Sequence, residues 1–210
     1  MLVHGQPTGL SVEKVSLMFS LARLDYSLTF VPWSRAYRNA QLRPSTCVFS
    51  TTRTAEREPL FRWIGPIAAS EWLLYARRDK ASPVRRLEDI GQAVVGGYNG
   101  DVIAEYLTAR RFNVDLSPND RSSALKLIGN RVDYWAVGQF TANVLIKTHG
   151  WEPLLVPVLT FNRSELYLAC HPDFPADAAL RLEAALATIR RDGRAQAIDL
   201  KYRDWAGAAP

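Results

Sequence analysis

Apolar positions along the chain recur with two periods, one typical of helices and one typical of strands. Val12, Val15 and Phe19 share one face of a helix predicted over residues 11–25. Ser11 is a plausible N-cap for this helix. The other elements predicted in this part of the chain are strands over 27–31, 46–49 and 72–76 and a short helix over 35–41.

The middle of the chain repeats a strand and helix unit. Strands are predicted over 93–96, 113–116 and 134–137, and helices over 101–109, 122–128 and 140–147. Two more strands (154–158 and 166–170), a helix over 176–191 and a shorter helix after Gly193 complete the pattern. Alternation of this kind predicts an α/β fold with parallel strands.

The alternation is interrupted near residue 78 and again near residue 172. We therefore predict two α/β lobes joined by two crossover strands, with lobe two (77–171) inserted into lobe one (1–76 plus 172–210). The polar stretch 77–82 is the expected crossing between them. Ligands of open α/β sheets bind beyond the carboxyl ends of strands, so a cleft between the lobes is the expected site.

Composition is that of an ordinary globular protein, because 48% of the 210 residues are hydrophobic and 22% are charged. This excludes collagen-like, coiled-coil and disordered classes. The net charge is +5, but the basic residues are scattered as pairs such as Arg77-Arg78 and Arg110-Arg111. Scattered pairs usually belong to solvated faces, so we expect no nucleic-acid partner.

The N-terminal residues show no signal peptide, and no apolar run approaches the length of a membrane helix. They enter turn chemistry at Gly5 and Pro7 with no predicted strand, so we expect the first strand of the domain to be missing. Cys47 and Cys170 lie far apart within apolar stretches, and two buried thiols are expected rather than a disulfide. No cluster with metal-ligand spacing is found, and we expect no cofactor.

A hydroxyl-rich loop with guanidinium groups follows the strand predicted over 46–49. Thr52, Thr54, Arg53 and Arg57 could hold a carboxylate by bidentate hydrogen bonds. The alternative is a capped helix start, with Thr54 as the N-cap.

Two further loops place polar groups after strands. In the glycine-rich turn after the strand over 93–96, Tyr98, Gly100 and Asp101 precede a helix whose free amides could meet an anion. Gln139 follows the strand over 134–137 and is either a ligand contact or an ordinary helix start. No nucleophile elbow or paired carboxylates occur near these loops, which favours binding without catalysis.

Four ordered segments together resemble the bacterial extracellular solute-binding proteins of family 3, which deliver polar amino acids and similar solutes to ABC importers. The segments are Gly9–Glu13, Thr54–Arg57 followed by Phe61 and Gly65-Pro66, Leu87–Gly91 before Val94–Gly96, and Gly129–Asp133. The resemblance covers nearly the whole chain. It implies a two-lobed clamshell in the periplasm, a membrane permease as partner, a monomer, and a small solute as ligand.

The resemblance assigns Thr52, Thr54 and Arg57 to the ligand's α-carboxylate, with Arg53 as a fallback anchor. Asp101 stands where the family usually has Thr or Ser, and Gly138 or Gln139 stands where it has the Asp that binds an α-amino group. We therefore expect a ligand other than a simple α-amino acid bound in the usual way, such as a cationic or polyol-like solute. Asp101 could instead cap the following helix.

Trp33 and Trp135 are candidate aromatic walls of the site, with core packing as the alternative for each. Two other functions use the same fold. One is a ligand-sensing domain of a signalling receptor, and the other is an enzyme of the cyclohexadienyl or arogenate dehydratase type, which the lack of an evident acid/base pair disfavours.

Overall fold

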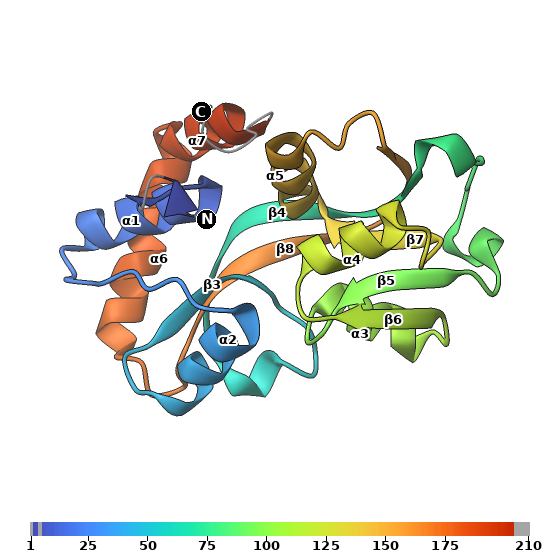
Figure 1. Ribbon diagram of the computed structural model, residues 1–210. Coiled ribbons are helices and arrows are strands. Elements are labelled where there is room, and N and C mark those ends of the chain that lie inside the picture. The colour runs from blue at the N-terminus through green and yellow to red at the C-terminus, as the bar shows by residue number, and fades with distance from the viewer. Residues whose placement is uncertain (1, 4–5, 204–210) are drawn as a thin grey trace. The chain divides into compact units, whose positions relative to one another are not determined.

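The computed structural model describes residues 2–3 and 6–203, which divide into two compact units (Figure 1). Unit 1 contains the described residues up to Ala69 and those from Glu165 onward, and unit 2 is Ser70–Ser164. Each unit has its own buried clusters of apolar side chains. The predicted α/β class is confirmed.

Unit 1 is built around two long helices that pack on each other. Its elements are β1 (Leu2–Val3), β2 (Gln6–Pro7), α1 (Leu10–Ala22), α2 (Trp33–Leu42), β3 (Cys47–Thr52), the 3-10 helix η1 (Glu58–Leu60), the first part of β4 (Arg62–Arg77), the last part of β8 (Leu155–Cys170), α6 (Ala176–Arg191) and α7 (Arg194–Arg203). Val15, Met18 and Phe19 of α1 contribute to the same buried cluster as Leu182 and Ile189 of α6. Helical spacing of apolar residues therefore predicted both helices, and the structure adds that they pack together.

Three sequence predictions in unit 1 are corrected. Gly9, and not Ser11, is the N-cap of α1. The strand predicted over 27–31 is irregular, because its side chains are at least partly exposed and it pairs with no strand among the described residues. The N-terminal segment, expected to lack a strand, forms the short antiparallel pair β1 and β2.

Unit 2 alternates strands and helices as predicted. Its elements are the rest of β4, the 3-10 helices η2 (Arg78–Lys80) and η3 (Leu87–Ile90), β5 (Val94–Tyr98), α3 (Val102–Ala109), β6 (Asn113–Ser117), α4 (Asp120–Ile128), β7 (Tyr134–Gly138), α5 (Gln139–His149) and the first part of β8. The strand β5 is parallel to β6 and β7, while β4 runs antiparallel to β7. Helices cover both faces of this sheet, since Leu73 packs with α4 and α5 and the next residue, Leu74, packs with α3.

The crossings between the units lie inside the long strands β4 and β8. The sequence predicted crossings at 76/77 and 171/172, whereas the units divide at 69/70 and 164/165. It also predicted two strands over 154–158 and 166–170, but β8 is one strand of 16 residues. The polar run Asn162-Arg163-Ser164 resembles a turn, although it lies within the strand. Hydrogen bonding is continuous from β3 to β6 because both crossover strands are members of the sheet.

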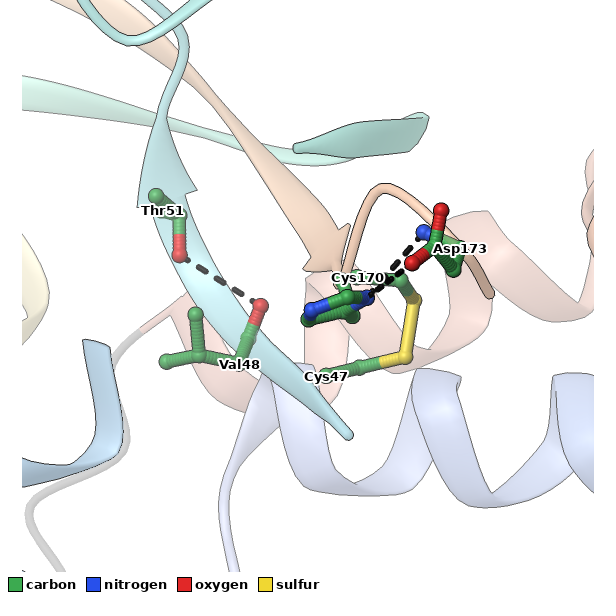
Figure 2. Close-up of a disulfide and its surroundings, with 6 residues drawn as sticks. Cys47, Val48, Thr51, Cys170 and Asp173 are labelled. Carbon is green, nitrogen blue, oxygen red and sulfur yellow. Dashed lines mark hydrogen bonds and ion pairs between the residues drawn. A yellow bond between two sulfur atoms is a disulfide. The ribbon is translucent and has the colours of Figure 1, made fainter. Parts of the chain in front are cut away.

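Cys47 and Cys170 form a disulfide, so the prediction of two free thiols is wrong (Figure 2). The two residues are direct partners in the antiparallel pairing of β3 and β8, and their Cα atoms are 3.9 Å apart. Their sequence separation is 123 residues. Only the strand register brings the two sulfur atoms together, and the apolar surroundings of each cysteine gave no sign of that register.

Candidate ligand-binding site

The sequence predicted a hydroxyl-rich loop after residue 49, but Ser50, Thr51 and Thr52 lie within β3. Ser50 has a left-handed conformation (φ 60°) at the bulge between Val48 and Thr51, and its Oγ donates to Ser11 Oγ at 2.8 Å. Thr51 is fully buried, and its Oγ1 donates to the Val48 carbonyl at 3.4 Å (Figure 2). Thr52, the last residue of β3, is partly exposed. The bulge thus uses two hydroxyls for structure and leaves Thr52 at the end of the strand.

Arg57 is buried in unit 1, with only 6% of its surface exposed. Its guanidinium carbon lies 5.2 Å from the centroid of the Tyr37 ring. The Arg57 backbone N–H donates to the Thr54 carbonyl at 3.1 Å and to Thr54 Oγ1 at 3.3 Å, so Thr54 closes the turn that holds Arg57. This agrees with the capping alternative for Thr54. The capping alternative does not explain why Arg57 is buried. A buried guanidinium is suited to charge-assisted bonds with a carboxylate.

Arg53, the fallback anchor, is held by neighbours in unit 1. Its Nε and Nη2 atoms each donate to the Glu58 carboxylate at 2.5 Å, and its guanidinium lies 5.7 Å from the Trp63 ring and 5.6 Å from the Tyr167 ring. The hydrogen bonds from Arg53 lower the pKa of Glu58 below its ordinary value, and those to Glu58 raise the pKa of Arg53. The charge of Arg53 is therefore already balanced within the protein.

Trp33 begins α2 and is partly buried. Its ring centroid lies 5.9 Å from that of Tyr37, the same ring that contacts Arg57. Trp33 also packs against the apolar cluster that includes Val48 and Phe61. Trp33 and Arg57 therefore both contact the Tyr37 ring.

In unit 2, the predicted residues Tyr98, Gly100 and Asp101 form the turn between β5 and α3. Gly100 has a φ of 79°, a conformation that favours glycine, and the Asp101 N–H donates to the Tyr98 carbonyl at 3.1 Å. Asp101 occupies the N-cap position of α3, yet its side chain makes no capping hydrogen bond. The alternative in which Asp101 caps the amides of Ile103 or Ala104 is therefore not supported.

Gly138 and Gln139 join β7 to α5, as predicted. Gly138 is the N-cap of α5, and Gln139 is the first residue of the helix and is partly buried. A Cβ atom at Gly138 would lie 3.5 Å from Ser70 Oγ, which is ordinary van der Waals contact. The backbone could accommodate a side chain here. Steric crowding therefore does not explain why this sequence has glycine instead of aspartate.

Trp135 belongs to the core of unit 2 and does not form a wall. The residue is 0% exposed and packs in the cluster that contains Tyr75, Val137 and Trp151. Its indole Nε1 has no hydrogen-bond partner within the protein. Core packing, the alternative for Trp135, therefore describes the structure.

Sequence reasoning missed Asp120 and Ser117, which lie at the same end of the unit 2 sheet as the predicted residues. Ser117 ends β6 and is paired with Tyr98 of β5, and Asp120 is the first residue of α4. Burial, and then the charge of Asp101, raise the pKa of Asp120 to about 7. In the sequence, Asp120 looks like an ordinary residue at a helix start, so the sequence did not indicate its raised pKa.

Two searches of the described residues are negative. No group of three or more His, Cys, Asp or Glu side chains within 2–3 and 6–203 could hold a metal ion. In the same part of the chain, no helix has the length and apolar character needed to cross a membrane.

Comparison with sequences finds no match, since no protein-family model and no curated protein corresponds to this chain. Comparison with solved structures finds several. A histidine kinase sensor domain with similarity to periplasmic binding proteins superposes with a TM-score of 0.87 at 21% identity, over 98% of this chain and 90% of that one.

Two further structures represent other functions on the same scaffold. The arginine-, lysine-, histidine-binding protein ArtJ from Geobacillus stearothermophilus gives a TM-score of 0.81 at 16% identity, over 96% of this chain and 88% of that one. An ancestral amino-acid-binding protein, a precursor of cyclohexadienyl dehydratase, gives 0.80 at 15% identity, over 95% and 86%. The chain therefore has the fold of the periplasmic binding proteins.

Proposed function

We propose that this chain is a solute-binding protein of the family 3 type that captures a small polar solute for an ABC importer. The observation that carries the proposal is Arg57, a guanidinium buried at the end of a hydroxyl-bearing loop. A buried guanidinium is suited to bind an anionic ligand group, because it can donate charge-assisted, bidentate hydrogen bonds to it. On this fold, Arg57 with Thr52 and Thr54 forms the anion-binding half of the site, and Trp33 borders it.

The second half of the proposed site lies in unit 2. Tyr98, Gly100, Asp101 and Gln139 supply its polar groups, and Asp101 gives it negative charge. We infer that unit 1 binds an anionic group of the solute and that unit 2 binds a hydroxyl or cationic group. The alternative anchor, Arg53, contributes less because Glu58 already balances its charge.

The disulfide supports an extracytoplasmic location. Structural disulfides persist in oxidising compartments such as the bacterial periplasm and are rare in the cytosol. Cys47 and Cys170 are joined at the edge of a strand pair in unit 1. A periplasmic monomer that docks on a membrane permease is consistent with this chemistry.

A thermal-shift screen of the full chain over amino acids, polyamines, opines and organic acids tests the proposal. A ligand present at 100 times its Kd should stabilise the protein by about 2.7 kcal/mol. Arg57→Ala should then weaken binding of an anionic ligand by about 2 kcal/mol, roughly thirtyfold. Calorimetric titration measures this loss.

Two variants control for folding and specificity. Arg57→Lys keeps the charge but removes the bidentate geometry, so it should also weaken binding. Arg43→Ala removes an exposed arginine after α2 and should leave binding unchanged. Unchanged affinity in both Arg57 variants would contradict the anchor assignment.

A sensor domain is the second candidate, because the superposition on a histidine kinase sensor domain covers 98% of this chain. It uses the same ligand contacts, so the screen applies to both, and permease or kinase genes beside this one would separate them. An enzymatic role is disfavoured because the sequence near these loops contains no nucleophile elbow. Turnover of a prephenate-like substrate by the purified chain would overturn that preference.

A further inference from the structure

Three buried side-chain atoms lack a hydrogen-bond partner within the part of the chain that the structure describes. They are Ser117 Oγ, Asp120 Oδ1 and Trp135 Nε1, and all three belong to unit 2. Buried polar groups in native proteins almost always have partners, so each such group calls for an explanation. Ser117 ends β6, Asp120 begins α4 and Trp135 lies in β7, where its indole is near Asp120. Three such atoms in one unit indicate a place prepared for a polar partner.

The local structure explains why Asp120 Oδ1 caps no backbone amide. Asn119 is the N-cap of α4, and its side-chain oxygen accepts from the Ser122 N–H at 2.9 Å. Asn119 therefore takes the capping role that an aspartate at a helix start often fills. The Trp135 indole N–H lies near enough to Asp120 to lower its pKa, but it completes no hydrogen bond with Oδ1.

The charge near Asp120 is negative. Burial raises its pKa most, and the carboxylate of Asp101 raises it further. Within the described residues, no cationic side chain counters this effect on Asp120. A carboxyl group in this setting holds its proton near neutral pH until a positive charge approaches.

The elements packed against α4 do not supply that positive charge. β5 and β7 carry only the tyrosine hydroxyls of Tyr98 and Tyr134 as titratable groups. On β6, Asp115 is paired with Lys126 of α4 at 2.7 Å. The one other basic residue of α4, Arg121, is exposed. The local charge that Asp120 meets is thus set by Asp101.

We propose that Asp101 and Asp120 bind a cationic group of the solute, an ammonium or a guanidinium, and that Asp120 gives up its proton to solvent when that group arrives. The O–H bond of Asp120 breaks, the proton passes to the buffer, and the cation takes its place. Ser117 Oγ can accept a hydrogen bond from the cation, while the Trp135 N–H can donate to the carboxylate formed at Asp120. This inference rests on the proposed function and names the class of group that its unit 2 half recognises.

Agmatine, L-arginine and putrescine are suitable probes, and L-citrulline is a neutral control for L-arginine. Agmatine has no carboxylate, so its binding tests this inference without Arg57. A guanidinium keeps its charge between pH 6 and pH 8. Affinity for agmatine should therefore rise roughly tenfold from pH 6 to pH 8 as Asp120 ionises. Calorimetry in two buffers of different ionisation enthalpy should show proton release at pH 6.

Asp120→Asn should weaken agmatine binding at pH 8 by roughly ten- to a hundredfold, abolish proton release and remove most of the pH dependence. Asp115→Asn, which removes an acid that already has a basic partner, should keep the wild-type pH dependence. Because Asp120→Asn could alter folding, the wild-type protein provides an independent measurement. NMR of its side-chain carboxyl carbons should show Asp120 titrating near pH 7 and shifting when agmatine is added.

Two results would overturn the inference. One is the absence of any response of the Asp120 signal to all three cations, and the other is equal binding of L-citrulline and L-arginine. If the screen instead finds an anionic or neutral ligand that requires Arg57 but not Asp120, the proposed function stands and this inference fails. If a cation binds through Asp120 while no ligand requires Arg57, the assignment of Arg57 to the anion-binding half of the proposed site is wrong.

Discussion

The candidate ligand-binding residues of unit 1 and those of unit 2 differ in how their charges are held. In unit 1, Arg53 is neutralised by Glu58 and stacked on two aromatic rings, and Arg57 is buried against Tyr37. In unit 2, Asp120 is partly exposed but its Oδ1 is buried, and it lies near a second carboxylate and near an indole that completes no bond with it. Unit 1 supplies its cations with internal partners, whereas unit 2 leaves a carboxyl group with an unfavourable charge. From this difference we expect unit 2 to determine selectivity if the proposed function is correct.

Removal of the disulfide should have the largest effect on stability, and it should act on unit 1. The cross-link closes a long loop, so Cys47→Ala with Cys170→Ala should lower the free energy of unfolding by about 2–5 kcal/mol. Denaturant unfolding measures the loss.

Hydrogen exchange then localises the effect of the double variant. Protection should fall mainly in β3 and the end of β8, while α3 and α4 keep theirs because unit 2 has separate buried clusters. Equal loss in both units would show that the two cores unfold together.

Asp120 should impose a pH dependence on the stability of unit 2. Its pKa is about 7 in the folded protein, above the ordinary value of 3.8, so the folded state binds more protons than the unfolded state between these values. Stability from this group is present below pH 4 and is lost as pH rises toward 7, at up to about 1.4 kcal/mol per pH unit.

Asp120→Asn should flatten this slope, and thermal unfolding of wild type and variant from pH 4 to pH 8 measures it. Asp115→Asn serves as the matched control. A wild-type Tm that rises from pH 4 to pH 8 by as much as the Tm of Asp120→Asn would contradict the environment assigned to Asp120.

The sequence predicted unit 2 well because its strands and helices are short and strictly alternating. It failed where tertiary pairing decides the outcome. Polar residues 162–164 lie inside β8, and the apolar run over 27–31 has no neighbouring strand. The strand register that joins Cys47 to Cys170 leaves no trace in the local sequence.

The candidate site residues likewise divide into those with a local sequence pattern and those whose environment depends on tertiary structure. Arg57 and Asp101 could be proposed from the sequence because each follows a strand in a loop with a recognisable pattern, and their roles remain predictions. Asp120 could not, since its pKa depends on burial and on Asp101, which is distant in sequence. Trp135 resembled a ligand contact because a large aromatic residue near a loop suits either role, and only its burial decides between them.

The Arg53 contacts should contribute a smaller effect, confined to unit 1. Arg53→Met removes the cation that lies over Trp63 and Tyr167, and an exposed cation–π contact is worth about 0.5–1 kcal/mol. Thermal unfolding should show a modest decrease in Tm. Affinity for an anionic ligand should change far less than in Arg57→Ala. A loss of affinity as large as that of Arg57→Ala would make Arg53 the anchor.

The smallest effect on stability is expected from Gly138→Asp, which restores a carboxylate at the end of β7. Gly138 has a φ of −73° and its Cβ position meets only ordinary contact with Ser70, so the backbone tolerates the change. Aspartate is a slightly better N-cap than glycine, and the free energy of unfolding should rise by a few tenths of a kcal/mol. The added charge should also strengthen binding of cationic solutes in unit 2, because it adds a third carboxylate to the acids already there.

Gly138→Asn is the matched control for this variant, since asparagine caps the helix without adding charge. Calorimetric titration of both variants with agmatine and L-citrulline separates capping from electrostatics. We expect Gly138→Asp alone to raise the affinity for agmatine, with L-citrulline unaffected. If Gly138→Asp and Gly138→Asn bound agmatine equally, the charge at this strand end would play no part in recognition. The acidic character of unit 2 would then reside in Asp101 and Asp120 alone.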